Sequence, residues 1–230
     1  MLTKLNFMNK KILIRFALTI FTISFYSYFG YMNLIYDVAA QPEIKIQKQL
    51  SEVKNVPNTV VKPQEYYGLK RAEIALKEFR KNIVEKPMGC NCGPEVDIYT
   101  QGYHSQWCTM FASWVTMKAE SPVEDKLTKN WRITNSRKFT EYLQQNGTWH
   151  DRDEVIANKL QPKMGDFVIF WRGDFEDNLG HVDIVVDVSE EIGRAGMVGG
   201  NLNGGVKYRN FSFVQNYGFL GFGNPEKGDK

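Results

Sequence analysis

The pattern of apolar residues changes near Gly165, and this change restricts the fold more than any other feature of the chain. Before it, apolar residues recur every three or four positions, which predicts amphipathic helices over about 69–83, 106–120 and 135–145. After it, short β-rich runs are separated by clusters of Gly, Asn and Asp, which predicts strands. These runs are Phe167–Trp171, Val182–Val188, Val206–Arg209 and Phe219–Phe222. Helices followed by strands predict an α+β fold, with the helices packed on a mostly antiparallel sheet.

The first 40 residues predict a membrane-targeting segment. Phe16–Tyr36 is a run of 21 residues without a charge, and four basic residues precede it. This length fits an N-terminal hydrophobic helix that spans the bilayer as an uncleaved anchor. Val38-Ala39-Ala40 has the small-residue spacing of a cleavage site, so a signal peptide cut after Ala40 is the alternative, and a buried core helix is a third. Either targeting segment would place the remaining chain at the inner membrane facing the periplasm or the cell exterior, or in secreted form.

The chain beyond residue 40 has no basic footprint. The formal charge of +3 is carried entirely by residues 1–40, so the remainder is neutral, which argues against nucleic acid as a partner. Residues 41–64 are polar, contain three prolines and no glycine, and predict a semi-stiff tether. Residues 65–226 then suffice for one domain with its own core. The sequence does not determine an oligomeric state.

Cys108 is the first candidate for chemistry, because Gln106-Trp107-Cys108-Thr109 lies where a loop is expected to become a helix. A thiol in the first turn of a helix feels the positive end of the helix dipole, which stabilises the nucleophilic thiolate. The alternative interpretation is a buried core cysteine on the apolar stripe of that helix.

His181 is the only one of three histidines that opens a predicted strand. Side chains alternate between the two faces of a strand, so one face carries the apolar residues from Val182 to Val188 that have even numbers. The other face carries His181, Asp183 and Asp187. An imidazole on the non-core face can meet a helix N-terminus packed across that face, and can serve Cys108 as base and then as acid. An exposed strand histidine is the alternative, and His104 could also reach Cys108 from its loop.

A third group should hold the imidazole in the right tautomer. Asn201, in Gly199-Gly200-Asn201, is the best candidate in the sequence, although Gly-Gly-Asn is also an ordinary turn. The backbone N–H of Cys108 is the expected oxyanion donor, and the Gln106 side chain is a second candidate.

Cys90 and Cys92 form a Cys-x-Cys pair in a predicted loop. Their spacing lacks the Cys-x(2–4)-Cys pair usual for zinc, so no metal and no cofactor is expected. A local disulfide and two unpaired thiols both stay open. The acidic cluster of Asp151, Asp153 and Glu154 does not match a calcium loop, and predicts a solvated helix start.

Several motifs together resemble the CHAP domain, the cysteine, histidine-dependent amidohydrolases and peptidases. The resemblance extends over roughly residues 66–225, and the order and spacing of the motifs make it specific. The motifs lie at Asn91–Val115, Asn135–Leu143, Pro162–Val168, Gly180–Val186, Gly199–Asn201 and Gly221–Pro225.

This resemblance implies a papain-like fold in which Cys108 is the nucleophile, His181 the general base and Asn201 the residue that orients the ring. Many members act on peptidoglycan, as amidases at the muramic acid to L-alanine bond or as endopeptidases in the peptide stem. The expected protein is therefore a membrane-tethered or exported thiol hydrolase of peptidoglycan. The alternatives are a catalytically weak wall-binding module and an amidase that acts on another amide.

Two positions depart from the pattern of the relatives. Many relatives have Glu where this chain has Gly199, which keeps the weak binding module open as an alternative. Relatives usually have Gly where Asp183 stands. Because residues two apart on a strand share a face, the Asp183 carboxylate is expected to favour the protonated imidazole of His181.

Overall fold

The computed structural model of the chain describes residues 40–53, 63–125, 129–172 and 180–226. Within these ranges, no helix combines the length and the apolar character that crossing a membrane requires. The N-terminal hydrophobic helix expected from the sequence lies outside the described residues, as do residues 54–62 of the expected tether.

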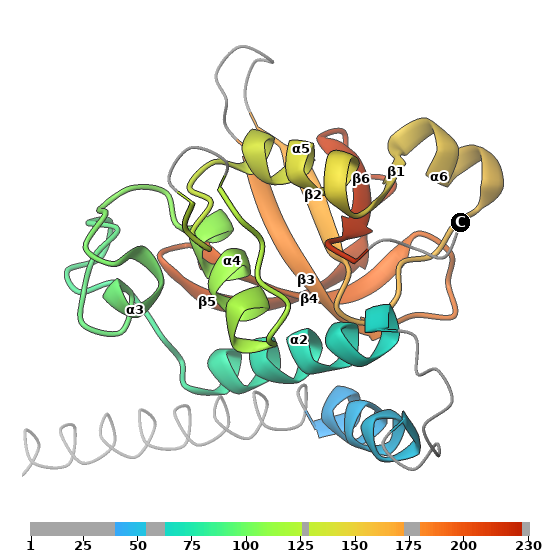
Figure 1. Cartoon of the computed structure of the whole chain (residues 1–230), viewed down its shortest axis with the longest axis horizontal. Coiled ribbons are helices and arrows are strands. Elements are labelled where there is room, and N and C mark those ends of the chain that lie inside the picture. The colour runs from blue at the N-terminus through green and yellow to red at the C-terminus, as the bar shows by residue number, and fades with distance from the viewer. Residues whose placement is uncertain (1–39, 54–62, 126–128, 173–179, 227–230) are drawn as a thin grey trace, which may run out of the picture. The chain divides into compact units, whose positions relative to one another are not determined.

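A six-stranded antiparallel sheet forms the centre of the fold (Figure 1). The strand order is β1-β6-β2-β3-β4-β5, so the strands that carry the predicted site, β3 and β4, are neighbours. The strands are β1 (Thr148–Asp151), β2 (Phe167–Trp171), β3 (Gly180–Val188), β4 (Arg194–Leu202), β5 (Gly205–Ser212) and β6 (Phe219–Asn224).

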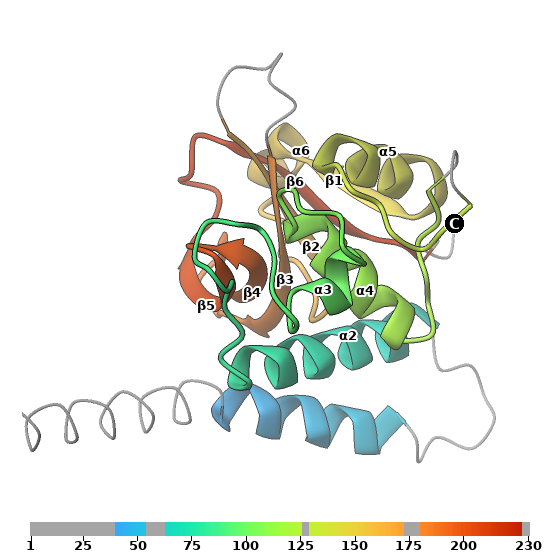
Figure 2. The same ribbon diagram turned by 90° about the vertical axis from the view of Figure 1, so that its left-hand side faces the viewer.

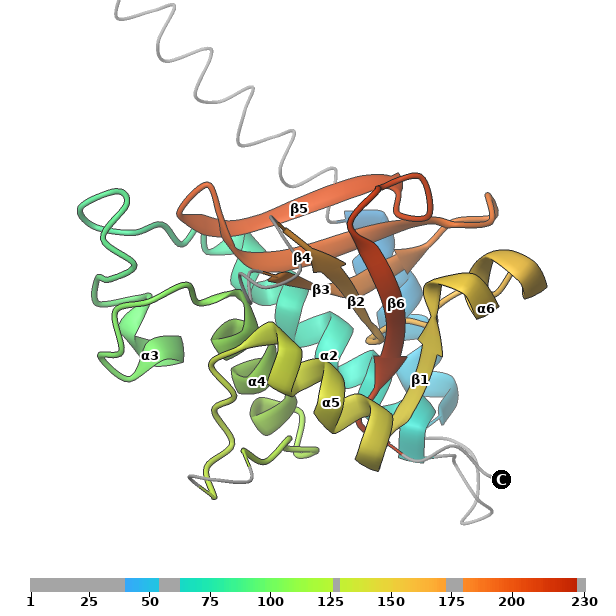
Figure 3. The same cartoon turned by 90° about the horizontal axis from the view of Figure 1, so that it is seen from above.

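Three of the helices lie on the same side of this sheet, as Figure 3 shows. They are α2 (Pro63–Arg80), α4 (Cys108–Lys118) and α5 (Ser136–Asn146). Figure 2 shows α4 beside α2, and both helices contact β3 and β4. The short helix α3 (Asp97–Thr100) packs against α4, and α6 (Arg152–Asn158) lies beside β1 and β6. The predicted α+β class, with helices packed on an antiparallel sheet, is confirmed.

The helices and strands that were predicted agree with the structure except at their ends. Asn135 caps α5 by accepting hydrogen bonds from the next backbone N–H groups, and Gly147 follows its last residue. The acidic cluster begins a helix as predicted, because Asp151 accepts a hydrogen bond from the Glu154 backbone N–H at 2.9 Å. Three of the labelled elements were not predicted: β1 and α3 have four residues each, too few for a periodicity to be recognised, and β4 contains three glycines, which are rare in strands.

The expected tether is helical where the structure describes it. Residues 40–53 form a helix, and Ile46 and Leu50, one turn apart, are buried. Lys45 reaches Asp187 of β3 at 2.8 Å. The sequence did not predict this helix, because most of its residues are polar and only a narrow apolar stripe is buried.

Both faces of the sheet are buried, which corrects the expectation that His181 lies on a non-core face. Val185, on the same strand face as His181, belongs to a second apolar cluster that packs on this side. The other buried members are Val155, Val168, Phe170, Ala195, Met197, Phe213, Phe219 and Phe222. His181 is itself only 1% exposed.

A β-bulge in β3 changes the alternation that the sequence predicts. The register against β4 shifts between Val185 and Asp187, and an extra residue in one strand moves the following side chains to the opposite faces. Val188 therefore packs against the cluster of Val185, and Asp187 pairs with Lys45 instead of lying beside Asp183. Only His181 and Asp183 keep the shared face that the sequence assigned to all three polar residues.

Candidate active site

Cys108 is the first residue of α4, and so lies in the first turn of the helix, as the sequence predicted. Its thiol is buried, with 5% of the residue exposed, and Sγ lies 3.7 Å from the carbonyl oxygen of Gly180 and 3.8 Å from Oγ1 of Thr109. The first N–H groups of a helix have no intrahelical acceptor, so their positive end is directed toward this sulfur. Cys108 is the one cysteine without a disulfide partner.

His181 meets this thiol at the start of β3. The Cys108 thiol interacts electrostatically with the imidazole, and Nε2 of the ring lies 2.8 Å from Oδ1 of Asp183. Because a carboxylate can only accept, Nε2 carries the proton of this bond. The buried Nδ1 has no hydrogen-bond partner among the described residues, so it is the ring nitrogen available to the thiol. The three side chains therefore form a continuous thiol–imidazole–carboxylate chain.

Asp183 is fully buried and is held from two sides. Its Oδ1 accepts from His181, and its Oδ2 accepts a charge-assisted hydrogen bond from Nη2 of Arg209. The Arg209 guanidinium also lies over the rings of Phe170 and Phe211, at 5.7 and 4.9 Å from their centroids. A buried carboxylate with partners on both oxygens stays ionised and fixed in orientation.

The surroundings shift the three pKa values in directions that favour an ion pair. Burial acts to raise the pKa of the Cys108 thiol, but the side-chain interaction and charge of His181 outweigh burial and lower it. Burial acts to lower the pKa of His181, but the charge and hydrogen bond of Asp183 raise it to about 9. Burial likewise opposes ionisation of Asp183, and His181 and Arg209 overcome it, so that its pKa is lowered. A thiolate beside an imidazolium is therefore the favoured state at neutral pH. The direction for His181 is the one that the sequence predicted.

Gly199 and Gly200 separate the two sides of β4. A Cβ on Gly199 would lie 2.0 Å from Oδ1 of Asp183, whereas a Cβ on Gly200 would lie 2.6 Å from Cβ of Phe111 in α4. The helix of the nucleophile therefore packs on the Gly200 side of the strand, not across the face that carries His181 as the sequence analysis expected. Cys108 reaches the imidazole at the first residues of β3.

The structure does not bring Asn201 to His181. The Asn201 carboxamide lies 3.2 Å from the carboxamide of Asn91 and 3.3 Å from that of Gln106. Its backbone has a φ of 58°, a left-handed conformation that Asn tolerates well. The second oxyanion candidate, Gln106, is exposed beside it.

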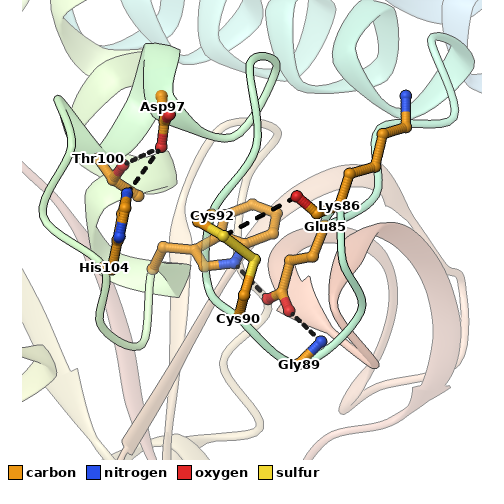
Figure 4. Close-up of a disulfide and its surroundings, with 9 residues drawn as sticks. Glu85, Lys86, Gly89, Cys90, Cys92, Asp97, Thr100 and His104 are labelled. Carbon is orange, nitrogen blue, oxygen red and sulfur yellow. Dashed lines mark hydrogen bonds and ion pairs between the residues drawn. A yellow bond between two sulfur atoms is a disulfide. The ribbon is translucent and has the colours of Figure 1, made fainter.

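The other titratable candidates lie apart from this chain of contacts. Nε2 of His104 is 3.5 Å from Asp97, and Nδ1 of His150 is 3.1 Å from Glu154. Cys90 and Cys92 form a disulfide, which decides between the alternatives that the sequence left open (Figure 4). In the described part of the chain, no three His, Cys, Asp or Glu side chains are grouped in a way that could hold a metal ion.

A pocket of about 340 Å³ lies next to the candidate site, between α5 and the strands β1, β2 and β6. Its lining includes Ser136, whose hydroxyl packs against Gly180, the residue that contacts the Cys108 thiol. Two tryptophans, Trp149 and Trp171, contribute to the same lining.

Comparison with known protein families agrees with this geometry. A family model for the CHAP domain matches residues 98–201, a range that contains Cys108 and His181 and ends at Asn201. The chain therefore carries a CHAP domain over these residues, which confirms the resemblance inferred from its motifs. Comparison with curated proteins and with solved structures gave no significant match.

Proposed function

We propose that this CHAP-domain chain is a cysteine-dependent hydrolase that cleaves amide bonds in peptidoglycan. The observation that carries the proposal is the buried contact chain from the Cys108 thiol through His181 to Asp183. A CHAP domain implies an amidase or peptidase with peptidoglycan as its substrate class. The papain-like architecture that the resemblance implies is part of the same proposal.

Cys108 is the proposed nucleophile. Its thiolate attacks the carbonyl carbon of the scissile amide and forms a tetrahedral intermediate, and His181 gives its Nδ1 proton to the leaving amine as the C–N bond breaks. The resulting thioester is then attacked by a water molecule, whose proton His181 accepts. Release of the carboxylic acid restores the thiolate beside the imidazolium.

Asp183 is the proposed orienting residue, in place of Asn201. Its Oδ1 fixes the Nε2–H tautomer, so that Nδ1 faces the thiol, and its charge stabilises the imidazolium. The Cys108 backbone N–H remains the first candidate for oxyanion stabilisation, because it lies at the start of α4. Gln106 remains the second candidate.

The rival proposal, a wall-binding module with little turnover, drew its support from Gly199. Many relatives have Glu at that position, and this chain lacks that carboxylate. Asp183 supplies a carboxylate to the same imidazole from the adjacent strand, and the space above Gly199 accommodates it. This carboxylate supports the proposal of an active hydrolase over the wall-binding module.

The substrate environment proposed for the enzyme is the cell wall outside the cytoplasm. A targeting segment in residues 1–40 would deliver the domain there, as an anchored or a secreted protein. The Cys90–Cys92 disulfide supports this placement, because disulfides persist in oxidising compartments.

Hydrolysis of purified sacculi tests the proposal. Wild-type protein should release soluble fragments, and Cys108→Ala should release at least about a thousandfold less, because the nucleophile is lost. Mass spectrometry of the fragments distinguishes an amidase, which frees intact stem peptides from the glycan, from an endopeptidase, which cuts within the stem. Binding to sacculi without cleavage would support the rival module. If the protein neither binds nor cleaves sacculi, the substrate is a different amide.

A further inference from the structure

Glu85 is a buried carboxylate that the proposed chemistry does not use. It follows α2 in a loop and is 3% exposed. Its Oε1 accepts a hydrogen bond from the Trp107 indole N–H at 2.8 Å, and its Oε2 accepts one from the Gly89 backbone N–H at 2.8 Å. A buried carboxylate is costly unless its oxygens have partners, so this residue and its two donors form a unit whose members depend on one another.

Trp107 connects this unit to the nucleophile, because it immediately precedes Cys108. Its side chain is fully buried and stacks on Tyr99, with ring centroids 5.7 Å apart and planes inclined by 12°. Gly200 leaves room for the indole, since a Cβ there would lie 2.7 Å from Cζ3 of Trp107. The hydrogen bond from the indole N–H to Glu85 thus fixes Trp107, the N-cap residue of α4.

Asn201 joins the same unit. The orientation of its carboxamide that satisfies both neighbours has Nδ2 donating to Oε1 of Glu85 at 3.2 Å and Oδ1 accepting from the Trp107 backbone N–H at 3.0 Å. Glu85 therefore holds Trp107 directly through the indole and indirectly through Asn201. The asparagine expected to orient His181 is placed instead at the start of the helix that carries the nucleophile.

The disulfide joins two residues two positions apart and lies directly after Gly89, whose N–H holds Glu85 (Figure 4). The Lys86 backbone N–H donates to the carbonyl of Cys92 at 3.1 Å, which closes residues 86–92 into the disulfide loop, directly after Glu85. Asn91, between the two cysteines, contacts the Asn201 carboxamide. Two connections therefore lead from the disulfide to the residues just before Cys108. One runs from Gly89 to Glu85, and the other runs from Asn91 to Asn201.

We propose that Glu85 is a positioning residue for the nucleophile and that the Cys90–Cys92 disulfide keeps it in place, so that full turnover requires the disulfide. The proposal rests on the proposed function, because it takes Cys108 as the nucleophile. Breaking the disulfide frees the loop, releases Trp107 and Asn201 from Glu85, and shifts Cys108 relative to His181. An enzyme of this kind is weakly active while its cysteines are reduced and gains full activity once it is exported and oxidised.

The test measures the reaction of Cys108 with iodoacetamide across pH, together with kcat on sacculi, in the full chain. The variants are Glu85→Ala, Glu85→Gln and the double variant Cys90→Ser/Cys92→Ser. In all of them, and in wild type, Cys108 is the sole free thiol, so alkylation reports on it alone. Glu85→Ala and the double variant should alkylate about tenfold more slowly at pH 7, with a similar fall in kcat and little change in KM, because misplacement weakens the thiolate–imidazolium pair. Glu85→Gln keeps an acceptor for the indole and should lose less.

Trp107→Phe provides a second route if Glu85→Ala does not fold, because it removes the indole N–H donor and keeps an aromatic ring next to Tyr99, although it also leaves a small cavity. It should reproduce the loss seen in Glu85→Gln or exceed it. Arg71→Met is the matched control for stability. It breaks the buried ion pair with Glu226, which shares no contact with the disulfide loop, and should lower Tm while leaving the alkylation profile as in wild type.

A dithiol reductant gives an independent arm. Dithiothreitol is oxidised to its cyclic disulfide as Cys90 and Cys92 each take up a hydrogen. It should lower kcat of wild type to that of the double variant and leave the double variant unchanged.

If the Glu85 and cysteine variants lose Tm but keep the wild-type alkylation profile and kcat, as Arg71→Met does, the residues are only structural and the proposal is overturned. If wild type fails to cleave sacculi while its alkylation responds as expected, the proposed substrate is wrong and the positioning role stands.

Discussion

Asp183 and Gly199 face each other on neighbouring strands, and the missing side chain of the glycine is what admits the carboxylate of the aspartate. A Cβ on Gly199 would lie 2.0 Å from Oδ1 of Asp183 and 2.9 Å from Nε2 of His181. Both contacts are far shorter than van der Waals separation, so no side chain larger than hydrogen is compatible with the present hydrogen bond. The carboxylate that orients the imidazole therefore comes from β3, and β4 contributes the space.

Gly199→Ala should disrupt the candidate site and leave the fold intact. The methyl group forces the Asp183 carboxylate away from His181, and a misplaced catalytic group costs up to about a hundredfold in rate. The measurement is kcat for wild type, Gly199→Ala, Asp183→Ala and the double variant. Because both single changes break the same hydrogen bond, their effects should not add. Additive losses would mean that Gly199 acts independently of Asp183.

Asp183→Asn should move the basic limb of the rate profile to lower pH. The active ion pair exists above the lowered pKa of Cys108 and below the pKa of His181, which Asp183 raises to about 9. Removing the negative charge lowers the His181 pKa, so the imidazolium is lost at a lower pH, and the Cys108 pKa rises as its positive partner weakens. The active range should therefore narrow from both sides. A basic limb that stays near pH 9 would contradict the role given to Asp183.

The sequence predicted the elements that carry the chemistry but not the way in which they meet. Helical spacing located α4, and the position of Cys108 at its start followed from the loop before it. Alternation placed His181 and Asp183 on one face, and this placement alone predicted that the pKa of His181 is raised. The hydrogen bond between them also depends on Gly199, a residue of another strand, and the register of β3 against β4 is not readable from either strand.

Other features could not be predicted because their signal lies in tertiary contacts. Glu85 stands in a loop without periodicity, and only the folded chain shows that it accepts the indole N–H of Trp107. Asn201 carries a motif that fits an orienting residue, yet its left-handed backbone directs the carboxamide toward the start of α4. The bulge in β3 inverted the assignments of Asp187 and Val188, since one inserted residue reverses every position after it.

Arg209→Leu should lower activity through Asp183. The change leaves Oδ2 of a fully buried carboxylate without its charged partner, so Asp183 can turn away from His181. We expect a fall in kcat of about tenfold and a loss of stability of roughly 1–3 kcal/mol, because an unsatisfied buried acceptor carries its desolvation cost. Arg209→Lys keeps the charge and should retain more activity than Arg209→Leu. Equal kcat values for wild type and Arg209→Leu would show that His181 alone suffices to hold Asp183.

Asn201→Ala and Asp183→Ala should impair the enzyme in two different ways, which separates the residue that orients the imidazole from the residue that positions the nucleophile. Asp183 contacts the ring, so its loss should lower the pKa of His181 and shift the basic limb of the rate profile, as well as reduce kcat. Asn201 contacts the Trp107 backbone and Glu85, so its loss should slow alkylation of Cys108 and reduce kcat while the basic limb stays where it is in wild type. The two profiles, recorded side by side with kcat and the alkylation rate at each pH, distinguish the roles even if the two variants lose similar activity. A shifted basic limb in Asn201→Ala, together with an unshifted one in Asp183→Ala, would restore Asn201 as the orienting residue.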